Sequence, residues 1–214
     1  MGAMAQKERV RNQPYADLKW LHLGFHVGIH SQDLLLTHTG VMTNGETWFA
    51  EIPSYSPGFS VGVIGDMYMN LRFTPSIHFG DKKFKFREQA TGEEFITNVR
   101  SSYLNFPLDV KYTALRLNNY RPYLIGGIYG SVDIGRKKGN PILLKSTDFG
   151  FEFGLGCDIY LPYFKLCPEL KFCFGLVNLL EKDRPDLVDQ ANIKYTDALS
   201  KATSRMVILT FNFE

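Results

Sequence analysis

Seven charged residues stand at positions where a β-strand would turn them toward one side, and both signs of charge are represented. They are Arg72, Asp109, Lys111, Arg121, Glu152, Glu169 and Lys171. Carboxylates such as Asp109 beside Glu152 or Glu169 suit general acid–base catalysis when they reach the reacting proton. However, no nucleophile, base and orienting group can be assembled from the sequence. We therefore interpret the seven as an interior polar network of mutually neutralising charges and predict no catalytic site.

Three histidines recur at every fourth position, as His22, His26 and His30. In a strand they share one face but stand about 13 Å apart. Ligands of one metal ion must converge to within about 2.0–2.3 Å of it. The spacing therefore predicts hydrogen bonding inside the protein and no metal site.

The cysteines and the glycine pairs carry no recognisable cofactor motif. Cys167 and Cys173 lie roughly 20 Å apart on one strand, too far for a disulfide, and Cys157 faces the other way. No CxxC spacing is present. Gly126-Gly127 and Gly154-x-Gly156 lack the strand-to-helix context of a phosphate-binding loop, so we predict no cofactor.

The elements that position these residues alternate with a period of two. In residues 165–176, Leu166, Pro168, Leu170, Phe172, Phe174 and Leu176 share one face, and Lys165, Cys167, Glu169, Lys171, Cys173 and Gly175 share the other. About eight such stretches are present, at 18–31, 58–64, 68–79, 99–112, 120–134, 147–160, 165–177 and 203–213. Alternation over about 10 residues between turn residues is typical of a transmembrane β-barrel.

A soluble lipocalin-like barrel also alternates, with its apolar face inside. The length of the stretches favours the membrane barrel, because about 9–11 residues cross a bilayer whereas an ordinary strand has about 5–6. The polar face is rich in glycine, as the crowded interior of an eight-stranded barrel requires, and its charges can neutralise one another. Pro75, Pro107, Pro122 and Pro168 cut against uninterrupted strands, and we expect bulges there or later strand starts.

The connections alternate between short and long. Gly65-Asp66, residues 113–119 and Pro162-Tyr163 indicate tight turns. The long connections are 33–57 (with Asn44-Gly45), 80–98, 135–146 and 178–202, the last of which has room for a short helix. An even strand number then places both termini on the short-turn side. In the third long connection, Arg136-Lys137-Lys138 reads as a solvated loop, with lipopolysaccharide phosphates as its functional alternative.

The chain is the size of one domain, with 214 residues. We interpret residues 1–5 as a cloning remnant, 6–17 as a flexible lead-in and 18–214 as a single barrel. A net charge of +2 with no basic cluster gives no case for nucleic acid. No apolar run reaches the 18 residues that a membrane-spanning helix needs.

Several segments resemble the PorT family of outer-membrane β-barrels from Bacteroidota. They are residues 103–112 (YLNFPLDVKY), 118–127 (NNYRPYLIGG), 24–28 (GFHVG), 79–84 (FGDKKF) and 168–172 (PELKF). The resemblance covers nearly the whole chain after Gln6. It implies an eight-stranded antiparallel barrel in the bacterial outer membrane, with long extracellular loops and short periplasmic turns.

The same resemblance implies a non-enzymatic part in protein export by the type IX secretion system, as an accessory or assembly component. An eight-stranded barrel agrees with that role, because its interior is only wide enough for its own side chains. The loops and the periplasmic rim would then contact other secretion components, and the wall would contact outer-membrane lipid. The alternatives are an enzyme acting on lipid or peptide in the lumen, and a plain adhesion or anchoring barrel.

Overall fold

The structure, a computed structural model, describes residues 11–16, 19–38, 48–51, 56–67, 70–88, 94–135, 145–180 and 199–214. Its strands are β1 (Leu21–His38), β2 (Trp48–Glu51), β3 (Ser56–Met67), β4 (Leu71–Phe73), β5 (Ser76–Glu88), β6 (Glu94–Thr113), β7 (Tyr120–Asp133), β8 (Thr147–Tyr160), β9 (Lys165–Gly175) and β10 (Leu199–Phe213). Among these residues, no helix is long and apolar enough to cross a membrane.

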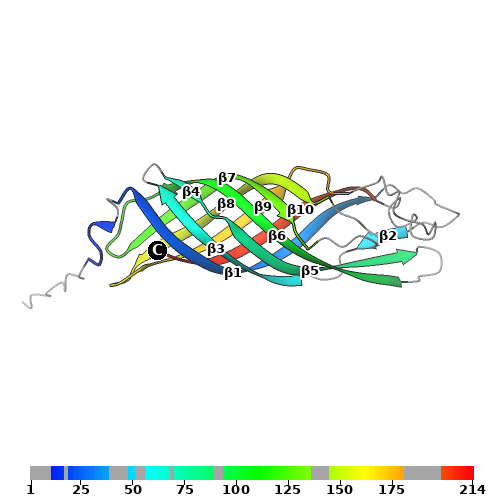
Figure 1. Cartoon of the computed structure of the whole chain (residues 1–214), viewed down its shortest axis with the longest axis horizontal. Helices are drawn as coiled ribbons and strands as arrows, with labels where there is room; N and C mark the ends of the chain where they lie inside the picture. The colour runs from blue at the N-terminus through cyan, green and yellow to red at the C-terminus, as the bar shows by residue number, and fades with distance from the viewer. Residues whose placement is uncertain are drawn as a thin grey trace, which may run out of the picture.

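The strands form one closed antiparallel barrel (Figure 1). The first strand, β1, pairs with β3 on one side and with the last strand, β10, on the other, which closes the sheet. The two segments β4 and β5 both lie between β3 and β6 and together make one barrel strand. The short β2 extends the sheet beside β5. The barrel therefore has eight strands, which confirms the predicted fold class.

Both ends of the described chain lie at the same end of the barrel as the three short connections (Figure 1). We call this the turn end and the opposite end the loop end. The turn predicted at Pro162-Tyr163 is confirmed, because the backbone N–H of Leu161 donates to the carbonyl of Phe164 at 3.0 Å. Residues 113–119 also lead through a tight turn into β7.

The turn predicted at Gly65-Asp66 is wrong, since both residues belong to β3. The chain reverses one step later, where the N–H of Asn70 donates to the carbonyl of Met67 at 2.9 Å. Asn70 has a left-handed backbone with φ 60°, and asparagine adopts that conformation more readily than most residues. The Gly-Asp pair was a plausible turn signal, but the strand ladder continues through it.

Two predicted long connections, 33–57 and 80–98, are shorter than expected, because β1, β3, β5 and β6 run into them. Likewise, β10 begins inside the predicted connection 178–202. In these segments charged residues interrupt the apolar alternation. The strands nevertheless continue, because alternation is required only where a strand crosses the lipid layer. Asn44-Gly45, Arg136-Lys137-Lys138 and residues 181–198, where a short helix had room, lie outside the described residues.

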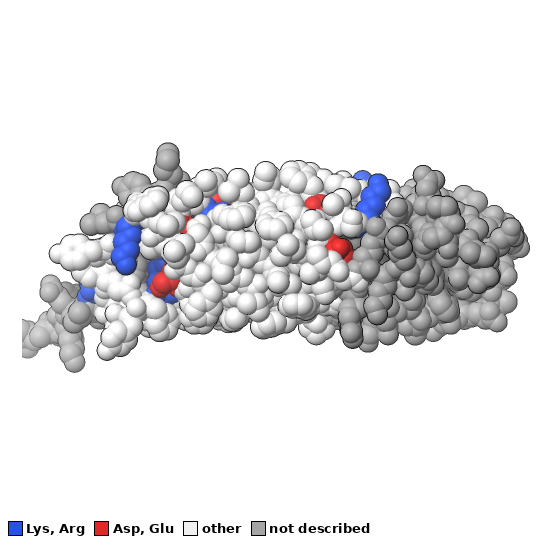
Figure 2. Space-filling model, viewed as in Figure 1, with Lys and Arg blue, Asp and Glu red and all other residues white. Residues whose placement is uncertain are grey.

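The apolar face of the barrel points outward and the polar face points into the lumen. On β8, for example, Phe153 and Leu155 are 50% and 54% exposed, whereas Glu152, the residue directly before Phe153, is 2% exposed. The middle of the wall seen in Figure 2 shows no charged side chain, and charges flank it toward both ends. This is the arrangement of a membrane barrel and the inverse of a soluble one.

Pro75 and Pro107 lie at a break in the ladder that does not shift its register, whereas Pro122 and Pro168 lie inside the uninterrupted strands β7 and β9. Thr74 and Pro75 separate β4 from β5, and Pro107 of β6 lies opposite this break. The register of β4 and β5 against β6 is the same, so the expected bulge is absent at this step. Pro107, which has no N–H donor, therefore lies opposite Thr74 and one register step from Pro75, where β6 has no ladder partner in β4 or β5.

Candidate functional site: the lumen ion network

Among the residues that the structure describes, ten charged side chains inside the barrel form one continuous set of ion pairs, which we call the lumen ion network. Its six acidic members are Asp66, Asp109, Glu152, Asp158, Glu169 and Glu214, and its four basic members are Arg72, Lys111, Lys165 and Lys171. They come from β3, β4, β6, β8, β9 and the end of β10. The network crosses the middle of the lumen and lines its turn end.

Arg72 of β4 is the centre of the network at the turn end. Its side chain is fully buried, and Nη1 donates to Glu169 Oε2 at 2.9 Å. Nη2 donates to Asp66 Oδ2 at 3.1 Å and to Glu214 Oε1 at 2.6 Å. The hydroxyl of Tyr123 also donates to Glu169 Oε2, at 2.6 Å. One guanidinium thus holds three carboxylates from three different strands or strand ends.

Lys171 of β9 is the second centre, in the middle of the lumen. Its Nζ lies 2.7 Å from Glu152 Oε1 and 3.2 Å from Asp109 Oδ2. It also lies 3.5 Å from Glu169 Oε1, and Glu169 in turn binds Arg72. This shared carboxylate joins the two centres into one network.

Lys111 of β6 is a further cation of the network at the turn end. Its Nζ donates to both carboxylate oxygens of Asp158, at 2.9 and 3.0 Å, and lies 3.5 Å from Asp66 Oδ2. Because Asp66 also binds Arg72, neighbouring cations share one carboxylate here as well. Sharing of this kind compensates the desolvation of buried charges, which isolated pairs compensate poorly.

Glu214 follows the last strand and reaches back into the turn end of the barrel. It pairs there with Lys165 as well as with Arg72. Burial by itself raises the pKa of the Glu214 carboxyl, but these two cations lower it to about 2. The residue continues the inward positions of β10, two places after the buried Asn212, so the period-two pattern was the signal that could have found it.

Of the seven sequence-predicted residues, six lie in the lumen ion network, and Arg121 does not. Arg121 lies near the rim of the turn end, where it donates to the carbonyl of Ala114 at 3.0 Å and to Thr113 Oγ1 at 2.7 Å. Sequence reasoning left out four members, namely Asp66, Asp158, Lys165 and Glu214. Asp158 and Lys165 share the inward parity of Glu152 and Lys171 and were open to the same inference.

Glycines on the inward face make room for the network. A Cβ at Gly127 would lie 2.2 Å from the carbonyl oxygen of Leu108 and 2.5 Å from Asp109 Oδ1. A Cβ at Gly154 would lie 2.4 Å from a backbone oxygen and 3.0 Å from Lys171 Cγ. The strands can approach and the long charged side chains can cross the lumen only because these positions carry no side chain.

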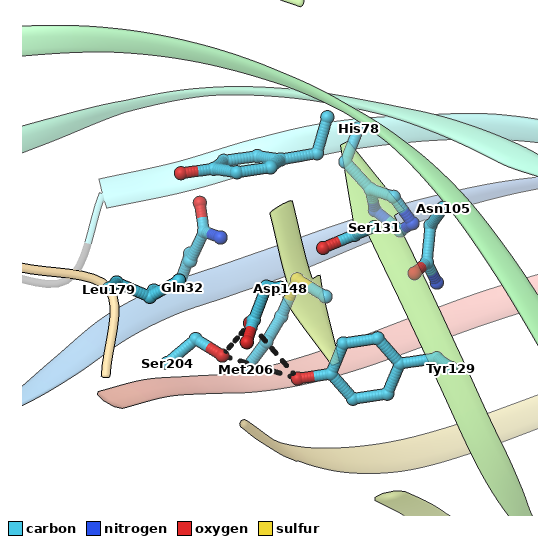
Figure 3. A pocket seen from close by; sticks show the side chains of 10 residues that line it. Gln32, His78, Asn105, Tyr129, Ser131, Asp148, Leu179, Ser204 and Met206 are labelled. Carbon is cyan, nitrogen blue, oxygen red and sulfur yellow. Dashed lines mark hydrogen bonds between the residues drawn. The ribbon is translucent and has the colours of Figure 1, made fainter. Parts of the chain in front are cut away.

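Nearer the loop end lies a smaller polar cluster, built around the single carboxylate of Asp148 (Figure 3). Ser204 donates to the carboxylate of Asp148, and the hydroxyl of Tyr129 lies 3.4 Å from that carboxylate and 3.2 Å from Ser204 Oγ. The cavity beside it has about 20 Å³, which is room for about one water molecule. The cluster therefore holds β7, β8 and β10 together and leaves little space for a substrate.

Two buried histidines, His26 and His78, line a small cavity together with Glu169 and Lys171 of the lumen ion network. The rings of His30 and His78 meet edge to face with their centres 5.0 Å apart, and His78 Nε2 contacts Ser76 Oγ at 3.0 Å. His22 lies near the turn end, with Nε2 2.8 Å from the carbonyl of Ala16. In the described part of the chain, no group of three or more His, Cys, Asp or Glu side chains could hold a metal ion. All three cysteines are free thiols.

The turn end opens into a polar cavity of about 320 Å³. Its walls include Lys19, His22, Asp66, Asn70, Lys111, Arg121, Asp158 and Lys165. The described part of the lead-in, 11–16, lies against the rim beside it. There Arg116 donates to backbone carbonyls of Asn12 and Gln13 and stacks on Tyr160, with 3.5 Å from its guanidinium carbon to the ring centre.

Such a lumen offers no path for a large molecule, because the charged side chains cross it and bind one another. A family model described as outer membrane protein beta-barrel domain matches residues 4–181. No curated protein matches the chain. The family match covers most of the chain and agrees with the closed eight-stranded barrel, its apolar outer wall and its filled polar interior. We conclude that this chain belongs to the outer membrane protein β-barrel domain family and resides in the bacterial outer membrane.

Proposed function

We propose that this barrel is a non-enzymatic accessory or assembly component of the type IX secretion system of Bacteroidota. The resemblance of residues 103–112 and 118–127 to the PorT family supports the choice of system. The observation that carries the role is the lumen ion network, because it blocks the interior with paired charges. A barrel filled in this way is suited to assist an export machine and is unsuited to be its conduit.

The absence of catalysis is part of this proposal. The carboxylates of Asp109 and Glu152, which resembled an acid–base pair in the sequence, both bind Lys171. Each is almost fully buried, behind the lipid-facing wall. A substrate would have to displace these ion pairs to reach them, so the arrangement favours a structural role for the two carboxylates.

Among the surfaces that the structure describes, the periplasmic rim is the strongest candidate for contacts with other secretion components. Short turns of outer-membrane barrels face the periplasm, so the turn end is the periplasmic end. At this end Leu115 and Leu117 are 88% and 69% exposed, and Tyr163 is 94% exposed. Exposed apolar side chains beyond the membrane-spanning strands are candidates for protein contacts.

Deletion of the gene in its host should abolish the release of secreted cargo proteins, and expression of the wild-type chain should restore it. Complementation by a Leu115→Ser/Leu117→Ser double variant should restore release poorly, although the barrel still inserts. The matched control is Leu176→Ser, which changes an exposed leucine, 58% exposed, at the loop end.

Immunoblotting of culture medium measures release, and the mobility shift of the unheated protein in detergent gels measures insertion. Normal release of cargo from the deletion strain would overturn the proposal. Normal release with lost attachment of cells to surfaces would indicate an adhesion or anchoring barrel instead.

A further inference from the structure

A groove of about 220 Å³ runs over the outer wall where β1 meets β10 and β3. Ile29, Val207 and Leu209 line it with Pro57, and Ile29 stands directly opposite Leu209 in the ladder. These side chains belong to the outward apolar face, so the groove faces lipid. It is not part of the lumen and does not involve the ion network.

The groove lies toward the loop end of the apolar wall, close to where the outward face of β10 becomes charged. On β10 the outward positions change from Leu209 and Val207 to Arg205, Thr203 and Lys201 toward the loop end. Arg205 is two residues from Val207, which is a rise of about 7 Å along a strand. An apolar groove is therefore continuous with a cationic strip on the same strand.

The charge of this strip is positive among the described residues. Lys201 and Arg205 are both exposed, and one carboxylate, Asp33, stands opposite Arg205 in the ladder. That carboxylate accepts a hydrogen bond from the N–H of Leu34 at 2.7 Å, which offsets part of its charge.

We propose that this groove and its two cations bind a phosphorylated lipid of the outer leaflet. One acyl chain lies in the groove over Ile29 and Leu209, and a phosphate of the headgroup pairs with Arg205 and Lys201. Charge complementarity selects this occupant, because an acyl chain beside two cations requires an anionic headgroup above the apolar tail.

The test is native mass spectrometry of the purified barrel in detergent, titrated with lipopolysaccharide and with the same lipid after dephosphorylation. Wild-type protein should carry bound lipopolysaccharide and bind the dephosphorylated form about tenfold more weakly, as expected for the loss of charge-assisted contacts. The Arg205→Ser/Lys201→Ser variant should bind intact lipopolysaccharide about tenfold more weakly than wild type does. Arg11→Ser/Lys19→Ser, which removes two exposed cations at the turn end, far along the barrel from Arg205 and Lys201, should bind like wild type.

Filling the groove tests the acyl chain separately from the charge. Ile29→Trp should fold, because Trp is tolerated on a lipid-facing wall, and should weaken binding of both lipid forms. Val207→Trp serves the same purpose if the first variant does not insert. Equal binding by the Arg205→Ser/Lys201→Ser variant and wild type would overturn the proposal. A wild-type dimer that Ile29→Trp disrupts would also overturn it, by assigning the groove to a second copy.

Discussion

Replacement of Arg72 by methionine should lower the free energy of unfolding by about 3–5 kcal/mol, the cost of removing one partner from a buried ion network. The guanidinium donates to Asp66, Glu169 and Glu214 and has no exposed surface. Methionine fills much of the same space but leaves three carboxylates close together without their shared cation. Urea titration of the folded barrel in lipid vesicles, followed by tryptophan fluorescence, measures the change.

Variants of Arg72 and of its partners can show which lost interactions account for the lower free energy of unfolding. Arg72→Lys should cost less than Arg72→Met, because an ammonium retains the charge although it loses the fork of parallel donors. Glu169→Gln in the Arg72→Met background should recover part of the loss by removing one unpaired carboxylate. Arg11→Met, at an exposed position of the lead-in, should unfold like wild type. Wild-type stability of Arg72→Met would contradict the importance of the network.

Replacement of Phe153 by arginine should destabilise the inserted barrel by about 2–4 kcal/mol, because it places a charge near the middle of the lipid layer. Phe153 is half exposed on the outward face of β8 and stacks on Phe172, with ring centres 5.6 Å apart. Phe153→Leu controls for the lost stacking and should cost clearly less. The same urea titration in vesicles measures both variants.

The matched control is an arginine introduced on the outward face of the same strand but close to the edge of the lipid layer. Thr147 is an outward residue at the loop end of the same strand, where an added arginine costs about 0–1 kcal/mol. Thr147→Arg should therefore unfold almost like wild type. Equal effects of Thr147→Arg and Phe153→Arg would show that the outer wall is not immersed in lipid as the exposed phenylalanines indicate.

The sequence predicts the barrel well wherever apolar and polar residues alternate inside the lipid layer. The predicted strand at 147–160 has the same bounds as β8, and the two faces of residues 165–176 are assigned as observed. The reason is physical, since a shift by one residue would turn every apolar side chain of a strand into the lumen. Because the bilayer requires apolar side chains on the outward face, the alternation in the sequence predicts the orientation of each strand.

Beyond the lipid layer this constraint no longer applies, and the sequence predicts the strand ends less accurately. Residues 81–88 alternate poorly in the sequence, yet they continue β5. The partners within the lumen ion network could not be predicted either. Arg72 and Glu169 are 97 positions apart, and their contact depends on the relative stagger of the strands around the barrel, which alternation does not specify.

The central claim is that the lumen ion network closes the barrel, so that its function resides on the rim, the loops and the outer wall. Electrical recording of the purified wild-type barrel in a planar lipid bilayer tests this most directly. Insertion is verified by the heat-dependent gel shift of the same sample. We predict no lasting conductance steps in 0.15 M KCl across the accessible voltage range. Steady unitary conductance from the inserted wild-type protein would show an open path through the lumen and contradict the account.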